Sequence, residues 1–180
     1  MSKLKFSLYL LAVFVFVACS EQKNQMGVSA KLDLPEQESW NAKITLLKEN
    51  LKRASVNAGH LVKFSEKDLI VMDEGVAVDF FDAEGKHLSY LESDSAIIIE
   101  KTSDMIAKGD VTVISDNGAT LYTEELRWDH KREKVVSDVD VIFITEKDTL
   151  RGKGFESNAD LTEWVIRQPV GVSEREIKVE

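Results

Sequence analysis

Alternating apolar and polar residues mark a strand and its return in the middle of the chain. Within Gly109–Asp129, the run Val111-Thr112-Val113 places its two valines on one side and the threonine on the other. This is the period-2 pattern of a half-buried strand. Asp116-Asn117-Gly118 follows, and because Asn and Gly tolerate positive φ the chain can reverse there. A second β-rich run, Ala119 to Trp128, then returns, so the stretch is predicted to be a β-hairpin.

Related hairpins are predicted on either side of this one. Upstream, Gly75–Phe80 alternates and Asp82–Gly85 turns; downstream, Val139–Phe143 alternates and Glu146–Asp148 turns. A leucine, a small residue two positions later and an apolar residue five positions later form a motif that recurs about every 30 residues. The motif starts at Leu91, Leu121 and Leu150. A near-constant period indicates stacked supersecondary units that bury a shared face, although an ordinary antiparallel β domain also fits.

Three ordered segments carry a family resemblance. They are Ala107–Asp129, Val136–Asp138 and Leu150–Ser157, within a region from Ser39 to Ile166. They resemble the LptC family, the membrane-anchored periplasmic components of the lipopolysaccharide transport bridge. The soluble bridge protein LptA, with its OstA-like domain, shares the repeat. The resemblance implies an all-β fold, an open twisted β-jelly-roll or trough of stacked antiparallel hairpins.

The resemblance also implies a function without catalysis or a cofactor. An LptC-like component would receive lipopolysaccharide from the inner-membrane ABC transporter, through LptF/LptG-like subunits, and pass it to an LptA-like periplasmic bridge. The transporter would supply the energy. Two alternatives remain from the residues alone: an outer-membrane lipoprotein that binds another lipid or a glycan, and a structural β-scaffold with a closed core.

The apolar side of successive hairpins is the candidate ligand site. An ordinary closed core accounts for these residues, but a stack of hairpins without covering helices can stay open along one side. Such a trough suits acyl chains, because each buried methylene contributes about 0.8 kcal/mol. The residues expected to line it are Val76, Val78, Phe80, Val111, Val113, Val139, Val141 and Phe143.

The two edges of such a stack are candidate partner surfaces, since an edge strand presents unpaired N–H and C=O groups. Leu161–Ile166 is predicted to be a late strand, and the resemblance implies that this edge, with Leu161, Trp164 and Val165, adds to the bridge protein. The other edge, near Trp40, would meet the transporter. Strand-like alternation continues to Glu180, where a frayed tail is the alternative.

The stretch Glu38–His60 has two interpretations. Apolar residues at helical spacing favour an amphipathic helix, whereas alternation from Trp40 to Leu46 favours a strand that turns at Glu49-Asn50. The resemblance favours two strands, and we adopt them. The prolines, Pro35 and Pro169, are expected to flank the sheet.

The N-terminal segment predicts export and lipid anchoring. Residues 1–18 read as a lipoprotein signal peptide, because an apolar run of about twelve residues spans only about 18 Å as a helix, short of the ~30 Å hydrocarbon core. Phe16–Cys19 resembles a lipobox, so Cys19 is the expected lipidation site. Residues 19–37 form a polar tether and residues 38–180 the β domain. The lipobox departs from the uncleaved helix of most LptC members; the inner membrane is the preferred location and the outer membrane the alternative.

Composition excludes several classes of function. A formal net charge of −9 at pH 7 argues against a nucleic-acid surface, which needs clustered cations. The single cysteine can make neither an internal disulfide nor a cysteine zinc cage. His60, His87 and His130 lie in different repeats and are expected to be isolated surface residues. We therefore predict no metal site and no catalytic residues.

Overall fold

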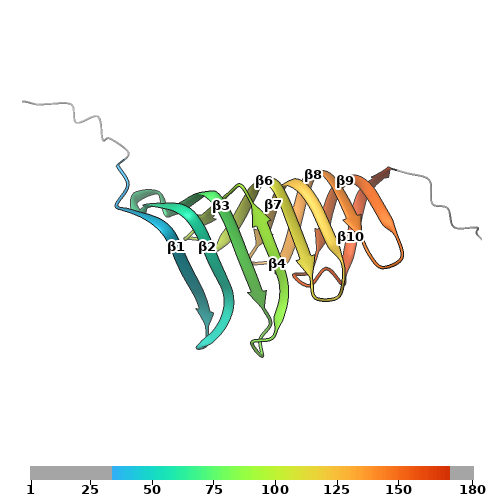
Figure 1. Cartoon of the computed structure of the whole chain (residues 1–180), viewed down its shortest axis with the longest axis horizontal. Helices are drawn as coiled ribbons and strands as arrows, with labels where there is room; N and C mark the ends of the chain where they lie inside the picture. The colour runs from blue at the N-terminus through green and yellow to red at the C-terminus, as the bar shows by residue number, and fades with distance from the viewer. Residues whose placement is uncertain (1–33, 171–180) are drawn as a thin grey trace, which may run out of the picture. The chain divides into compact units, whose positions relative to one another are not determined.

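The computed structural model describes residues 34–170, which form one antiparallel sheet of ten strands (Figure 1). The first five are β1 (Gln37–Lys48), β2 (Leu51–Phe64), β3 (Leu69–Phe81), β4 (His87–Ser93) and β5 (Ser95–Ile99). The remainder are β6 (Asp104–Ser115), β7 (Thr120–Asp129), β8 (Lys134–Ile144), β9 (Thr149–Ser157) and β10 (Trp164–Val170). A short 3-10 turn, Ser65–Lys67, precedes β3.

Strand order follows the chain, so nearly every connection is a hairpin between neighbours. The order is β1-β2-β3-β4-β6-β7-β8-β9-β10, with β5 paired to β3 and β6. The predicted all-β fold is confirmed, and the hairpin from Gly109 to Asp129 corresponds to β6 and β7.

The helical interpretation of Glu38–His60 is wrong: the stretch lies in β1 and β2. Both turn residues between these strands, Glu49 and Asn50, have positive φ, which suits a two-residue hairpin. Pro169 does not flank the sheet either. It lies within β10 opposite Gly152, on an edge strand, where a sheet tolerates a missing N–H.

The middle of the long strands departs from regular pairing, and these departures line up across the sheet. Register shifts interrupt the ladders β2–β3, β6–β7, β7–β8 and β8–β9. At the break between β4 and β5, the Asp94 N–H donates to the Gly109 carbonyl at 3.0 Å and the Asp94 carbonyl accepts from Gly75 N–H at 3.2 Å. Positive φ occurs along this line at Asn41, Glu74, Gly75, Gly109, Asp110 and Gly154. Aligned bulges of this kind bend a sheet sharply, so we call this line the bend.

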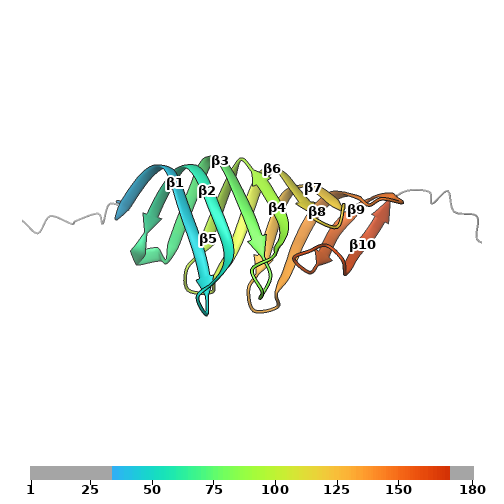
Figure 2. The same cartoon turned by 60° about the horizontal axis from the view of Figure 1, so that its bottom comes forward.

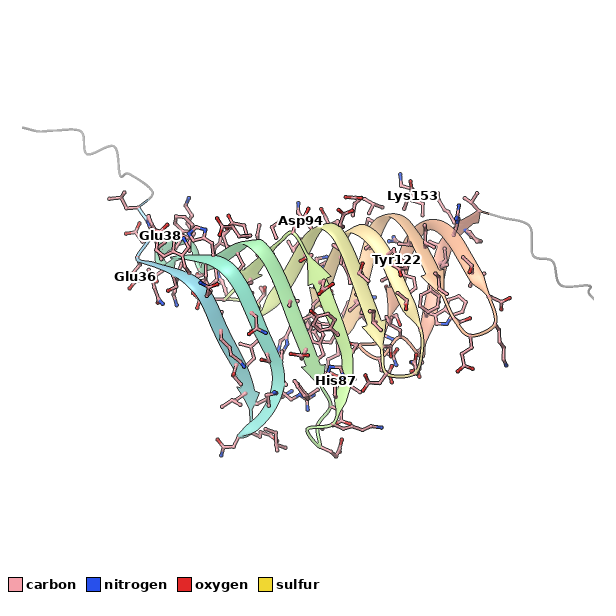
Figure 3. All side chains as sticks on the ribbon, viewed as in Figure 1. Glu36, Glu38, His87, Asp94, Tyr122 and Lys153 are labelled. Atoms are coloured by element: carbon pink, nitrogen blue, oxygen red, sulfur yellow. The ribbon has the colours of Figure 1, made fainter. Side chains whose placement is uncertain are left out.

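The bend folds the sheet into two facing layers (Figures 1 and 2). The strand halves that end in turns 49–50, 82–86, 116–119 and 145–148 form the first layer. The halves that end in turns 65–68, 100–103, 130–133 and 158–163 form the second layer. Asp94 lies on the bend and His87 near the opposite rim (Figure 3).

Cross-strand rows of apolar side chains fill the space between the layers. In the first layer, successive register partners form one row from β1 to β9: Ile44, Val56, Val78, Leu91, Val113, Leu121, Phe143 and Leu150. In the second layer a row contains Leu61, Met72, Ala96, Ala107 and Leu126. Aromatic rings join the layers, with centroids 6.5 Å apart for Phe80 and Trp128 and 5.2 Å apart for Phe143 and Phe155.

Candidate functional site

Six of the eight residues predicted to line a trough are buried between the layers. Val76, Val78, Val111, Val113, Val141 and Phe143 are each at most 3 % exposed. The side chains of their outward neighbours are more exposed: Ala77 and Thr112 are half-buried and Asp140 is exposed. The alternation thus identified the buried side of these six positions in β3, β6 and the last part of β8.

The other two residues differ from these six. Phe80 is only partly buried and packs on the core beside Trp128 at the rim. Val139 is half-buried and stands apart from the core cluster of the described residues. It lies between Ser137 and Asp140, where the β8–β9 register shifts, so the period-2 extrapolation through Val139 fails at the bend.

Several interior residues were missing from the predicted lining. Among them are Leu91, Leu121, Met72 and Phe155, each at most 3 % exposed. The recurring leucine motif contained the signal for three of them, because its first and third positions in each repeat are the inward residues. Met72 lies in the half of β3 that precedes Gly75, where the predicted alternation began.

The interior is apolar from end to end and its polar groups are matched. The buried polar side chains are serines and one threonine, and no buried side-chain N or O atom of the described residues lacks a hydrogen-bond partner. Thr123 Oγ1, for example, donates to the Asp140 carbonyl at 2.9 Å. Such an interior offers contact area without charge, which suits hydrocarbon and disfavours anionic groups.

The N-terminal edge strand, β1, is apolar on its surface and fastened by a charged bridge. Exposed hydrophobic side chains on β1 and at the start of β2 are Trp40, Leu46, Leu47 and Leu51. His60 of β2 lies between two carboxylates: Nε2 is 3.0 Å from Glu38 Oε1 on β1, and Nδ1 is 2.8 Å from Asp73 Oδ1 on β3. The hydrogen bond to Glu38, followed by that to Asp73, raises the pKa of His60 above its usual value of 6.5.

His60 is therefore not the isolated histidine that the sequence predicted. The Trp40 ring lies against the imidazole, with centroids 5.3 Å apart. His87 is paired as well, with Nδ1 2.9 Å from Asp116 Oδ1. These pairs do not amount to a metal site: within residues 34–170 no group of three His, Cys, Asp or Glu side chains is arranged to hold a metal ion.

The C-terminal edge strand, β10, is also apolar and also fastened by charge. Val165 is 59 % exposed, while Trp164 is 38 % exposed and its ring closes the end of the interior against Phe143, with centroids 5.0 Å apart. Arg167 reaches across Gly154 to β8, where its guanidinium contacts Asp138 and lowers the pKa of that carboxyl. Glu38 and Lys153 mark the opposite ends of the sheet (Figure 3).

Leu161 departs from the predicted edge. It precedes β10, has a φ of 60°, and is 2 % exposed within the core. A buried residue outside the strand cannot pair with a partner's strand, so the prediction that Leu161 forms part of the partner edge is wrong. Cys19, the signal peptide, most of the tether and the tail 171–180 lie outside the described residues.

These features define a class of protein: a single antiparallel sheet, bent into a jelly roll around a continuous apolar interior, with both edge strands unpaired and apolar within the described chain. A family model for lipopolysaccharide assembly, LptC-related, matches residues 8–170. The chain belongs to the LptC family. The chain is therefore a component of lipopolysaccharide transport, and the family as a whole supplies periplasm-facing, non-enzymatic components that work with other Lpt proteins.

No curated protein matches the chain. Within residues 34–170 no helix is long and apolar enough to cross a membrane.

Proposed function

We propose that the protein carries lipopolysaccharide acyl chains between its two layers, receiving them from the inner-membrane ABC transporter and passing them to an LptA-like bridge. The observation that carries this proposal is the row of apolar residues that continues from β1 to β9 without a break. A continuous apolar path between two partner edges keeps hydrocarbon out of water over the length of the domain.

The two edges support contact with a neighbouring protein at each end. Both outer strands keep a free side within the described chain, and both expose apolar residues, Trp40 on β1 and Val165 on β10. Strand addition there would extend the sheet into a neighbouring jelly roll and join the two interiors. We assign the β1 edge to the LptF/LptG-like transporter subunits and the β10 edge, through Trp164 and Val165, to the LptA-like bridge.

Anchoring through a lipid on Cys19 completes the proposal. The polar tether, residues 19–37, is long enough to hold the domain clear of a membrane surface, and the inner membrane is the preferred site.

A structural scaffold is the competing function, and one observation favours it. Six of the eight lining residues are at most 3 % exposed, so acyl chains would have to part side chains that are already in contact. The first proposal therefore requires the interior to open, whereas the scaffold requires it to stay closed.

Site-specific photocrosslinking separates the two functions. A photoreactive residue at Val78, Val113 or Val141 should capture lipopolysaccharide when the transporter hydrolyses ATP. The same probe at the adjacent outward positions Ala77, Thr112 and Asp140 should capture much less, because a one-residue step exchanges the faces of a strand. Equal capture at both sets would mean that the register or the ligand is wrong, and no capture at the inward set would contradict the carrier function and support the scaffold.

A further inference from the structure

The connection between β9 and β10, Asn158–Glu163, crosses from the second layer to the rim of the first. We call this connection the strap. Three rim side chains donate hydrogen bonds to the carbonyls of its second and third residues. The donors and distances are Ser89 Oγ at 3.0 Å, Ser115 Oγ at 2.7 Å and Asn117 Nδ2 at 2.6 Å.

The strap also places an apolar plug between the layers. Leu161 is 2 % exposed and belongs to the core cluster, although it lies in a loop at the rim. Its φ of 60° is a left-handed conformation that a leucine rarely adopts. The surrounding contacts therefore hold the backbone in a costly conformation that directs this side chain into the core.

Hydrogen bonds within the strap make it one stiff unit. Asn158 Oδ1 accepts from the N–H groups of Thr162 at 3.1 Å and Glu163 at 3.0 Å, and Asn158 N–H donates to the Glu163 carbonyl at 3.2 Å. None of these bonds reaches the first layer. The hydrogen bonds within the strap are thus separate from those that hold it to the rim, so it can leave the rim by exchanging its rim hydrogen bonds for bonds to water.

We propose that the strap is the gate through which an acyl chain enters the C-terminal half of the interior, with Leu161 as its plug. This inference rests on the proposed function, because a gate has meaning only if the interior receives lipid. At the bend the two layers are joined by the backbones of the strands that run through it, so they cannot part there. The rim at the strap is held by side-chain hydrogen bonds and one apolar side chain, so it opens at lower cost.

A reversible cross-link tests the gate. The experiment uses the full chain with Cys19→Ser, which removes the natural thiol. Two new cysteines, Asn117→Cys and Asp160→Cys, are then joined by the shortest cleavable thiol cross-linker that spans them. Binding of cis-parinaric acid, a fluorescent fatty acid, would be followed by energy transfer from tryptophan, since Trp128 packs on Phe80 at the rim and Trp164 packs on the buried Phe143. The gate predicts at least tenfold slower uptake by the cross-linked chain and full recovery once the cross-link is cleaved.

A second cross-link, between Thr112→Cys and Tyr122→Cys, is the control. These residues are paired neighbours on the outward face of β6 and β7, so joining them leaves the strap free. If both cross-links slow uptake equally, or if neither slows it, the gate is overturned and the proposed function is not affected. Absence of uptake in the chain without cross-links overturns the proposed function, and the gate with it.

A pair of serine variants tests the same gate without a cross-linker. Ser89 and Ser93 both lie on β4, both are buried, and each donates a hydrogen bond to a backbone carbonyl at 3.0 Å. The Ser89 bond holds the strap, whereas the Ser93 bond, to Ser95, lies at the bend. Ser89→Ala should speed uptake several-fold and Ser93→Ala should leave it unchanged at matched thermal stability. Equal rates for the two variants would contradict the gate.

Discussion

At the scale of single residues, charged pairs add to the ladders and the packing that hold the two outer strands. His60 joins β1 to β3 through Glu38 and Asp73, and Arg167 joins β10 to β8 through Asp138. An edge strand has a ladder on one side only, so such bridges restrain it where the core does not. Both bridges are solvent-accessible, which makes their contribution sensitive to pH and salt.

The His60 bridge predicts a pH-dependent edge. Because the folded-state pKa of His60 is raised above 6.5, its stabilisation is fully present below about pH 6.5 and is lost as pH rises through the folded-state pKa. Wild-type protein should therefore lose unfolding free energy as the pH rises above about 6.5, and His60→Gln should lose less over the same range. Denaturant unfolding at several pH values measures this difference.

Hydrogen exchange locates the effect within the sheet. In the wild type, amide protection in β1 should fall with rising pH after correction for intrinsic exchange, while β7 should change little. The carboxyls of Asp104 and Asp138 have lowered pKa values, so their contributions change only in acid, outside this window. Identical pH profiles for wild type and His60→Gln would show that the bridge contributes nothing.

At the scale of elements, each outer strand keeps one free side within the described chain and carries its own exposed apolar residues. Natural sheets usually blunt such sides with charge, proline or bulges. Here β10 carries Pro169 near its end, while Trp164 to Arg167 is free of proline. The usable part of this edge is therefore its first half.

A proline at Val165 should separate the two partners. Val165→Pro removes an N–H from the usable half of β10 and should weaken capture of the LptA-like bridge about tenfold, or about 1.4 kcal/mol. Contact with the transporter should be preserved. A pull-down of the full chain with each partner measures both effects.

The matched variant is Lys43→Pro, at an exposed position of the opposite edge strand, β1. It should weaken the transporter contact and spare the bridge. Loss of both contacts in either variant indicates unfolding, which circular dichroism would detect, and the reverse pattern would mean that the two edges are assigned the wrong way round. Leu161 is unsuitable for this test, because proline cannot adopt its φ of 60°.

At the scale of the whole molecule, one sheet supplies both layers of the jelly roll. A two-layer fold normally needs separate sheets or covering helices, but the aligned bulges turn this sheet over on itself. The interior consequently runs across the strands, in the direction from β1 to β10, and ends at the two edge strands. That geometry suits a conduit between neighbouring domains.

Membrane attachment is the prediction that concerns the chain as a whole. If Cys19 is lipidated, the protein should partition into membranes and incorporate a fatty-acid probe, and Cys19→Ser should abolish the label. The released protein should keep the stability of the domain, because the polar sequence of the tether offers little apolar surface to a core. Labelling that persists in Cys19→Ser would refute anchoring at this residue.

Local pattern determined much of this protein from the sequence alone. Period-2 alternation identified the inward faces of β3, β6 and β8, because the side chains of a strand alternate whatever lies around it. Positive-φ residues located the turns, and the leucine repeat identified stacked hairpins. Around Glu49-Asn50 the helical spacing of apolar residues and the turn signal indicated different structures. The pairing of β2 with β3 favours the strand over the helix.

Only the tertiary structure decided what depends on contacts between distant residues. Val139 lies outside the core because a bulge at the bend interrupts the period-2 alternation on which its predicted inward position depended. Leu161 is a plug rather than an edge residue because the rim of the first layer, far away in sequence, binds the strap by hydrogen bonds to its carbonyls. The His60 bridge joins three strands, and no spacing along one strand encodes it. These features depend on contacts between strands or between layers. They follow from how the folded sheet brings distant residues together, and not from any local run of residues.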